Sequence, residues 1–267
     1  RVAGKFYEEA VMKALDIATS VFASSSRAWR GTAAFASTPS KPEKLLELYE
    51  YEGCPFCRLV REVLCELDLD AMIYPCPKGG MRFRGTAIDL SGASQFPLLV
   101  DPNNDVVLLE SAEIIDYLYH QYGGGRRRAS RGVLRQVDML SSLAATALRS
   151  SPKPRGMYAA ESTAPAEPLE LYSFESSPYA RLVRERLSEL EIPYRLRNFA
   201  KSRWQEMGPP IVREKFFPDA PITSDNRLRL RELTGRSQVP YLVDPNTGVA
   251  MFESADIIDY LNETYAG

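Results

Sequence analysis

The sequence predicts an α/β protein built from two tandem copies of one unit, each preceded by an additional helix. Residues 46–69 and 169–192 share 14 identities in 24 ungapped positions, and residues 95–122 and 238–265 share 17 in 28. Both blocks combine short alternating stretches with helical periodicity, which indicates a mixed fold. We divide the chain into a helix and linker (1–42), a first unit (43–122), a second helix and linker (123–166) and a second unit (167–267).

The additional helices are expected at residues 4–22 and 130–149, where apolar residues recur at helical spacing. Packing against the units or against each other is one interpretation of these stripes. A role at a membrane surface or toward a partner protein is the alternative, although the charges on the polar faces are mixed. Ser/Pro/Ala-rich linkers follow at residues 24–41 and 150–167. The stripes comprise Tyr7, Ala10, Val11, Ala14, Leu15, Ala18, Val21 and Phe22 in the first helix and Val133, Val137, Leu140, Ala144 and Leu148 in the second.

Each unit begins with a short strand followed by a helix. Residues 45–50 and 169–174 alternate as strands do. In the first unit the helix that follows has apolar residues at helical spacing, among them Leu59 and Val63. A proline, Pro55 or Pro178, falls in its first turn, where the missing N–H has no helical partner in any case.

A second strand, a hairpin and a closing helix complete each unit. The second strands are expected at 71–75 and 194–198, and the closing helices at 111–122 and 254–265. The hairpin strands, at 97–100 and 106–109 in the first unit and at 240–243 and 249–252 in the second, flank an Asp-Pro-Asn turn. The resulting βαβ…ββα order is that of the thioredoxin fold.

The two units differ in the segment between their conserved blocks. It has 25 residues in the first unit (70–94) and 45 in the second (193–237), so the second carries an insertion of 20 residues. The insertion contains prolines at 209, 210, 218 and 221, and this composition predicts a loop.

Composition narrows the class of protein. Of the 267 residues, 45% are hydrophobic and 25% charged, and the net charge is −2. This balance is typical of a globular protein and gives no general attraction to nucleic acid or membranes. No apolar run approaches the roughly 18–20 residues that span a bilayer. The four cysteines, all between positions 54 and 76, are too few and too clustered for a secreted disulfide scaffold, which favours a reducing compartment.

The first unit contains a Cys-x-x-Cys motif at the expected start of its first helix. A helix N-terminus lowers a thiol pKa from about 8.5 toward 3.5–7.5, so Cys54 is expected to be the reactive thiolate. Cys57 lies one turn further on, where it can attack a mixed disulfide formed at Cys54. The motif therefore predicts thiol–disulfide exchange. A zinc site would need more ligands, and the single histidine, His120, lies in the closing helix. A relic pair on a binding module is the third interpretation.

The other cysteines and a basic cluster allow more than one interpretation. Cys65 falls two turns after Cys57, and we assign it to helix packing. Cys76 follows the second strand on a loop and is either a third redox partner or an idle thiol. The arginines at 126–128 and 131 are expected in a solvated turn, with a phosphate or acidic partner as the alternative.

These motifs resemble the glutaredoxin-like N-terminal domain of glutathione transferases. Cys54-Pro55-Phe56-Cys57 after a strand, Phe96-Pro97 before a hairpin and Glu110-Ser111 opening the last helix carry the resemblance, which covers about 43–122 and 167–265. The tandem members of plant and algal plastids and the membrane-associated prostaglandin E synthases of type 2 are similar. The all-helical C-terminal half of a full transferase, which builds most of the pocket for the electrophile, has no counterpart here.

The resemblance implies a glutathione site in each unit. Pro97, after Phe96, and Pro240, after Val239, stand where the family holds a cis-proline beside an extended thiol ligand. The pairs Glu110-Ser111 and Glu253-Ser254 stand where the family receives the γ-glutamyl carboxylate, and plain helix capping is the alternative. Ser177 replaces Cys54 and Ala180 replaces Cys57 in the second unit, which excludes disulfide exchange there. Ser177 either stabilises a glutathione thiolate, as in some transferase classes, or belongs to a retired site.

We therefore predict a glutaredoxin-like oxidoreductase that acts through Cys54 and Cys57 and uses glutathione but no metal. Its partners are expected to be glutathione or protein thiols, not nucleic acid, and a protein partner on the additional helices remains an alternative. A transferase or isomerase, and a non-catalytic glutathione-binding or assembly module, are the competing functions. The plastid resemblance and the absence of an initial methionine suggest a removed transit peptide and a location in the chloroplast stroma.

Overall fold

Both predicted units are present in the computed structural model, which describes residues 2–34, 41–125, 133–151, 153–207, 215–217 and 222–267. The predicted strands and closing helices agree with the observed ones to within a residue or two at each end, whereas the first helix ends at Ser26, four residues later than predicted. The predicted start of the second additional helix lies outside the described residues. Pro55 and Pro178 lie in the first turn of their helices, as expected. The first unit contains β1 (Leu46–Glu50), α2 (Pro55–Glu66), β2 (Ala71–Pro75), α3 (Arg84–Ser91), β3 (Leu98–Asp101), β4 (Val106–Leu108) and α4 (Ser111–Gln121).

The second unit repeats this order and adds a short 3-10 turn. Helices α3 and α8 were not predicted, because each presents few apolar residues to the core; Ala87 is the buried apolar residue of α3 and Leu230 that of α8. The insertion of the second unit precedes α8, and its prolines lie outside the described residues. The elements are β5 (Leu169–Ser173), α6 (Pro178–Glu189), β6 (Tyr194–Asn198), η1 (Trp204–Glu206), α8 (Asp225–Thr234), β7 (Tyr241–Asp244), β8 (Val249–Phe252) and α9 (Ser254–Tyr265).

The two units share one sheet of eight strands. The strand order is β4-β3-β1-β2-β6-β5-β7-β8, and β2 pairs antiparallel with β6, with Met72 opposite Arg195. Within each unit the first two strands are parallel and the hairpin is antiparallel. The units therefore join edge to edge, and each covers the strand edge that the other would expose.

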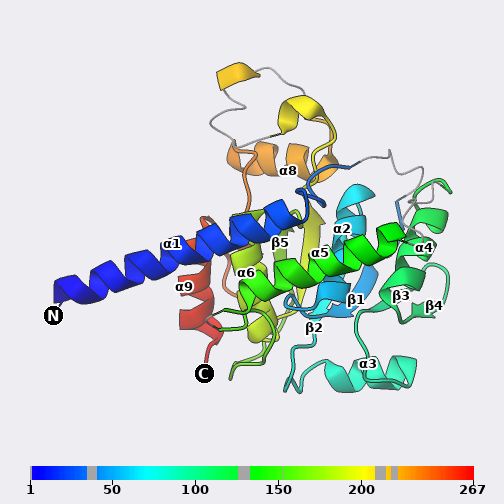
Figure 1. Cartoon of the computed structure of the whole chain (residues 1–267), viewed down its shortest axis with the longest axis horizontal. Coiled ribbons are helices and arrows are strands. Elements are labelled where there is room, and N and C mark those ends of the chain that lie inside the picture. Colours follow the sequence, from blue (N-terminus) through cyan, green and yellow to red (C-terminus); the bar gives the residue numbers. More distant parts are fainter. Residues whose placement is uncertain (1, 35–40, 126–132, 152, 208–214, 218–221) are drawn as a thin grey trace.

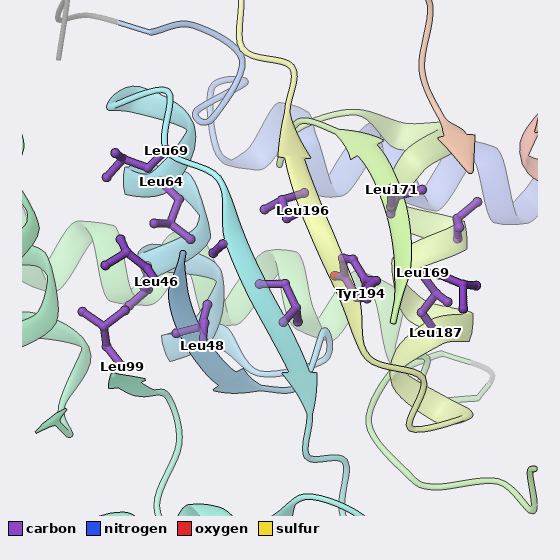
Figure 2. Close-up of a cluster of buried hydrophobic side chains, with 14 of the residues drawn as sticks. Leu46, Leu48, Leu64, Leu69, Leu99, Leu169, Leu171, Leu187, Tyr194 and Leu196 are labelled. Carbon is purple, nitrogen blue, oxygen red and sulfur yellow. The ribbon is translucent and has the colours of Figure 1, made fainter. Parts of the chain in front are cut away.

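One hydrophobic core runs through both units (Figure 2). Leu46, Leu48 and Leu64 of the first unit belong to the same buried cluster as Leu169 and Leu187 of the second. The side chains of Tyr194 and Leu196, on β6, lie between these two groups. The units are thus copies in sequence but share one core in three dimensions.

The additional helices cross over between the units. Helix α1 (Val2–Ser26) packs against α5 (Val133–Arg149) and α6, and α5 packs against α2. The helix that precedes each unit thus covers the first helix of the other unit, on one face of the sheet (Figure 1). Matching bonds support the crossing: Ser20 Oγ donates to the carbonyl of Pro178 at 2.8 Å, and Ser142 Oγ to that of Pro55 at 2.7 Å.

Packing of the additional helices on the units and on each other is thus confirmed, but the apolar stripes do not form the packed faces. The stripe residues Leu15 and Phe22, and Val137 and Leu140, are exposed. Tyr7, Ala10 and Val133 have side chains outside the described set. The buried positions are instead small or polar: Ser20, Ala23, Ser24 and Arg27 in α1, and Ser142, Ala145, Thr146 and Arg149 in α5.

No helix among the described residues is both long and apolar enough to cross a membrane.

Candidate functional site

Cys54 occupies the N-cap of α2, as predicted. Its Sγ accepts a hydrogen bond from the backbone N–H of Cys57 at 3.3 Å. Burial disfavours the thiolate, but the hydrogen bonds of Cys57, the N–H of Phe56 and the charge of Arg61 outweigh it and lower the pKa of Cys54 to about 7. Cys54 keeps 2% of its surface exposed. It is therefore the thiol of this chain suited to be a nucleophile near neutral pH.

The other three thiols are held in their protonated form. Burial and the neighbouring Cys54 raise the pKa of Cys57 well above its ordinary value. Burial raises the pKa of Cys65 to about 12, and its Sγ accepts the backbone N–H of Glu175 at 3.2 Å, so the packing role predicted for it is confirmed. Cys76 is fully buried with a raised pKa, which favours the idle thiol over the redox partner. All four are free thiols.

One side of the Cys54 site is aromatic and basic. The Phe96–Pro97 peptide bond is cis, as the resemblance implied. Tyr51 packs edge-on against Phe96 with 6.4 Å between ring centroids, and Arg84 lies 4.7 Å above the Phe96 ring. Burial and the thiols of Cys54 and Cys57 raise the pKa of Tyr51, which keeps its hydroxyl protonated.

Sequence reasoning missed Tyr51 and Arg84. The signal for Tyr51 was present, because the second unit has Phe174 at the same position. The second unit thus lacks both the hydroxyl of Tyr51 and the sulfur of Cys54.

Glu110 and Ser111 open α4 in an unusual backbone conformation. Glu110 is the N-cap with φ of 64°, and its side chain makes no capping bond but pairs with Gln95. Glu253 repeats this with φ of 67° and accepts a bond from Gln238 at 3.3 Å. Plain capping by these glutamates is therefore wrong. Non-glycine residues at such φ values cluster at binding sites.

The second unit keeps the geometry of the first without its sulfur. Ser177 is the N-cap of α6, and its Oγ accepts the N–H of Ala180 at 3.3 Å. The Val239–Pro240 bond is also cis. Ser177 is buried like Cys54. The N-cap side chain and the cis-proline are thus present in both units, and the N-cap carries a sulfur only in the first.

The linkers that follow α1 and α5 line the two sites, which was not predicted. The carbonyl of Gly156 accepts the N–H of Gly53 at 2.9 Å, next to Cys54. In the second unit the carbonyl of Gly31 accepts the N–H of Ser176 at 3.4 Å. The linker after α5 therefore binds the loop before α2 in the first unit, and the linker after α1 binds the loop before α6 in the second. Both linkers contain an Arg-Gly pair, at residues 30–31 and 155–156, and this shared pair could have indicated that they have the same role.

Charged side chains are buried below the sites, at the seam between the units. Glu175 is shared by three arginines: Arg61 at 2.9 Å, Arg184 at 3.1 Å and Arg58 at 3.6 Å. Burial opposes the charge of Glu175, but these arginines hold its pKa well below the usual range. Because Arg61 belongs to α2 and Glu175 to the second unit, the second unit supplies part of the electrostatic environment of the first.

Glu52 plays the equivalent part in the first unit. It pairs with Arg184 at 3.0 Å and with Arg61 at 3.2 Å. Arg61 also contacts Glu50, whose pKa burial raises to about 7. Sequence reasoning treated these arginines as an ordinary polar helix face, although the identical Arg-Leu-Val-Arg-Glu run in both copies marked them.

Two alternatives named from the sequence concern other ligands, a zinc ion and a phosphate or acidic partner. Within the described ranges, no group of three or more His, Cys, Asp or Glu side chains is placed to hold a metal ion. The arginine cluster at residues 126–131 lies outside those ranges.

Comparison with known proteins gives one family. The model described as "Glutathione S-transferase, N-terminal domain" matches residues 48–126 and again residues 171–267. No curated protein matches. A solved structure, "Leishmania TDR1 - a unique trimeric glutathione transferase", aligns at 14% identity with a TM-score of 0.28, over 84% of this chain and 68% of that one. A TM-score this low carries no weight in the assignment.

Proposed function

Because the chain belongs to the glutathione S-transferase N-terminal domain family, we propose that its first unit is a glutathione-linked thiol–disulfide oxidoreductase acting through Cys54 and Cys57. The observation that carries this proposal is the place of Cys54 at the N-cap of α2, with a pKa of about 7, beside a protonated Cys57. Cys54 has the larger thiolate fraction near neutral pH and therefore attacks first, and Cys57, one turn further on, can attack Cys54 Sγ once a mixed disulfide has formed.

The reaction begins when the Cys54 thiolate attacks the glutathione sulfur of a glutathionylated thiol. The old S–S bond breaks, the substrate sulfur leaves and takes a proton, and a Cys54–glutathione disulfide forms. Cys57 then attacks Cys54 Sγ, and its proton goes to the departing glutathione. Two further glutathione molecules reduce the Cys54–Cys57 disulfide and become glutathione disulfide. In a route without Cys57, a second glutathione thiolate attacks the mixed disulfide directly.

The glutathione position follows from the family and from the contacts described above. We propose that the backbone beside Pro97 pairs with the extended tripeptide, as a strand would. The open N-terminus of α4, with Ser111, would receive the γ-glutamyl carboxylate. Glu110 holds that turn through its left-handed backbone and its bond to Gln95.

Reduction of a glutathionylated peptide, coupled to glutathione reductase, tests the proposal. We expect Cys54→Ser to lower the rate to the uncatalysed background, since a hydroxyl is far too weak an acid to take part in exchange. Cys57→Ser should keep the route that uses only Cys54. Ser177→Ala is the matched change at the equivalent N-cap and should leave the rate nearly unchanged. Retained activity in Cys54→Ser would refute the proposal and favour the non-catalytic module.

The second unit is proposed to bind glutathione without redox chemistry, because it keeps the N-cap, the cis-proline and the left-handed Glu253. Because the second unit shares its sheet and core with the first, it should be tested in the full chain and not in isolation. Calorimetry on the full chain carrying Cys54→Ser, with and without Glu253→Ala and Ser254→Ala, is the suitable measurement. Loss of these polar partners should weaken binding, since hydrogen bonds to a charged group contribute about 1.5–3 kcal/mol each. Absence of a second binding event at millimolar glutathione would make the second unit structural.

The same geometry supports a transferase as the second candidate function, with Ser177 holding a glutathione thiolate. Conjugation of glutathione to a chloronitrobenzene distinguishes the two. Activity that survives Cys54→Ser and is lost in Ser177→Ala would favour the transferase.

We also propose a location in the chloroplast stroma, on the resemblance to tandem plastid members. Microscopy of the complete gene product fused to a fluorescent protein tests this proposal, and a secretory distribution would refute it.

A further inference from the structure

Two buried arginines at equivalent positions of the repeat carry unpaired N–H groups. Arg58 of α2 and Arg181 of α6 each open the Arg-Leu-Val-Arg-Glu run of their unit, and they are 2% and 1% exposed. Within the described part of the chain, Nε and Nη1 of Arg58 and Nε of Arg181 have no hydrogen-bond partner. Buried donors in native proteins almost always have one, so these groups need an explanation.

The two arginines meet at Glu175 but are not equally satisfied there. Arg181 donates from Nη2 to the backbone carbonyl of Glu175 at 3.4 Å, and from Nη1 to the carbonyl of Ser20 on α1 at 2.7 Å. Arg58 Nη1 lies 3.6 Å from the Glu175 carboxylate, which is beyond hydrogen-bond distance. The arginine of the first unit therefore lacks the bonds that hold its counterpart.

The carboxylates at the seam between the units do not balance its arginines. Among the described residues, four buried arginines lie within 4.0 Å of three carboxylates, which leaves one positive charge in excess. Arg27 and Arg149, which flank the seam, do not change this balance, because each is paired with a glutamate of its own. Burial and the charge of Arg58 lower the pKa of Arg181 to about 9, as expected for a cation without full compensation. The arginines are Arg58, Arg61, Arg181 and Arg184, and the carboxylates are those of Glu50, Glu52 and Glu175.

We propose that Arg58 and Arg181 bind one small monovalent anion of the halide class, chloride in ordinary solution, at the seam between the units. The anion accepts the unpaired N–H groups and supplies the missing negative charge. A water molecule accepts the same N–H groups but leaves the charge uncompensated, and uncompensated buried charge is costly. The anion is small because the helices above it pack closely: Ser20 and Ser142 bond to the first turns of α6 and α2 at 2.8 and 2.7 Å.

Urea unfolding of the full chain tests the proposal, with sodium chloride exchanged for sodium gluconate at constant ionic strength under reducing conditions. An anion that binds the folded chain but not the unfolded one lowers the equilibrium constant of unfolding. Above the dissociation constant of a single site, we expect this constant to fall about tenfold for each tenfold rise in chloride concentration. Gluconate is too large for the site, whereas bromide should act as chloride does.

Two arginine variants separate a bound anion from a general effect of salt. Arg58→Met removes the charge and the donors but keeps an unbranched side chain. It should lose the chloride dependence and, in gluconate, be at least as stable as the natural chain, because the excess charge is gone. Arg186→Met on α6 is the matched control and should keep the dependence, since Arg186 pairs with Glu189 at 3.1 Å and its side chain is 20% exposed.

A natural chain whose unfolding does not respond to the exchange of chloride for gluconate would overturn the proposal. So would a chloride dependence that Arg58→Met retains, or a loss of stability in this variant that is the same at every chloride concentration. Diffraction from crystals of the natural chain grown in bromide needs no variant to fold. We expect an anomalous peak between Arg58 and Arg181, and its absence at a bromide concentration that stabilises the chain would refute the site.

Discussion

Replacing Glu175 with Gln removes the anion that three buried arginines share, and we expect this to lower the free energy of unfolding by about 3–5 kcal/mol. The side chain is 3% exposed, and its carboxylate lies 2.9 Å from Arg61 and 3.1 Å from Arg184. Glutamine preserves the shape, so the effect reports the charge. Removing one member of a buried ion pair is costly because the other charges stay buried without full compensation.

The pH dependence follows from the same contacts. The arginines hold the pKa of Glu175 below its unfolded value, so its contribution is fully present above about pH 4.5 and is lost as the pH falls toward 2. The natural chain should therefore lose stability over this acid range more steeply than Glu175→Gln does.

Urea unfolding followed by circular dichroism measures the effect. Glu170→Gln is the control, because Glu170 pairs with Arg197 at 2.8 Å but its side chain is 28% exposed. That change should lower the free energy of unfolding by no more than about 1 kcal/mol. Equal losses in the two variants, or a loss below 1 kcal/mol for Glu175→Gln, would refute the view that the seam between the units is held by compensated buried charge.

Three further predictions concern the Cys54 site. Alkylation of Cys54 at pH 6 should be faster than that of the other three cysteines and should rise to half its maximum near pH 7, in line with its pKa; peptide mapping that finds equal rates at all four would contradict this. Mild oxidation should give a Cys54–Cys57 disulfide, and a dominant peptide linked through Cys76 would identify the loop thiol as the true resolver. Gly156→Ala should slow peptide reduction and lower the melting temperature more than Gly79→Ala does. Both glycines have a positive φ (62° and 79°), but only at Gly156 would the new Cβ meet a side chain, at 2.8 Å. Equal effects of the two substitutions would show that this contact is unimportant.

Local patterns were enough to predict most of the secondary structure. The alternation of residues 45–50 and the proline at position 55 are properties of adjacent residues, so they could be interpreted without knowledge of the rest of the chain. Helices α3 and α8 were missed because each buries a single apolar residue, which leaves no periodic signal. The same holds for the site. Cys54 was predicted because it lies next to the start of a helix, whereas the contact of Gly156 was missed because this residue is about 100 positions away in the sequence.

The sequence by itself determined the repeat, the βαβ…ββα order of each unit and the copy that carries the sulfur, because these depend on identity and spacing along the chain. Only the tertiary structure decided which helix faces are buried. Periodicity places Leu15 and Leu140 on an apolar stripe, but the stripe is exposed, while Arg61 and Arg184 are inside. An arginine can be buried only where negative charges compensate its own. For Arg61 one of these, Glu175, comes from the other unit, and pairing of β2 with β6 brings it there. That partnership exists only in the folded chain, so no local pattern could reveal it.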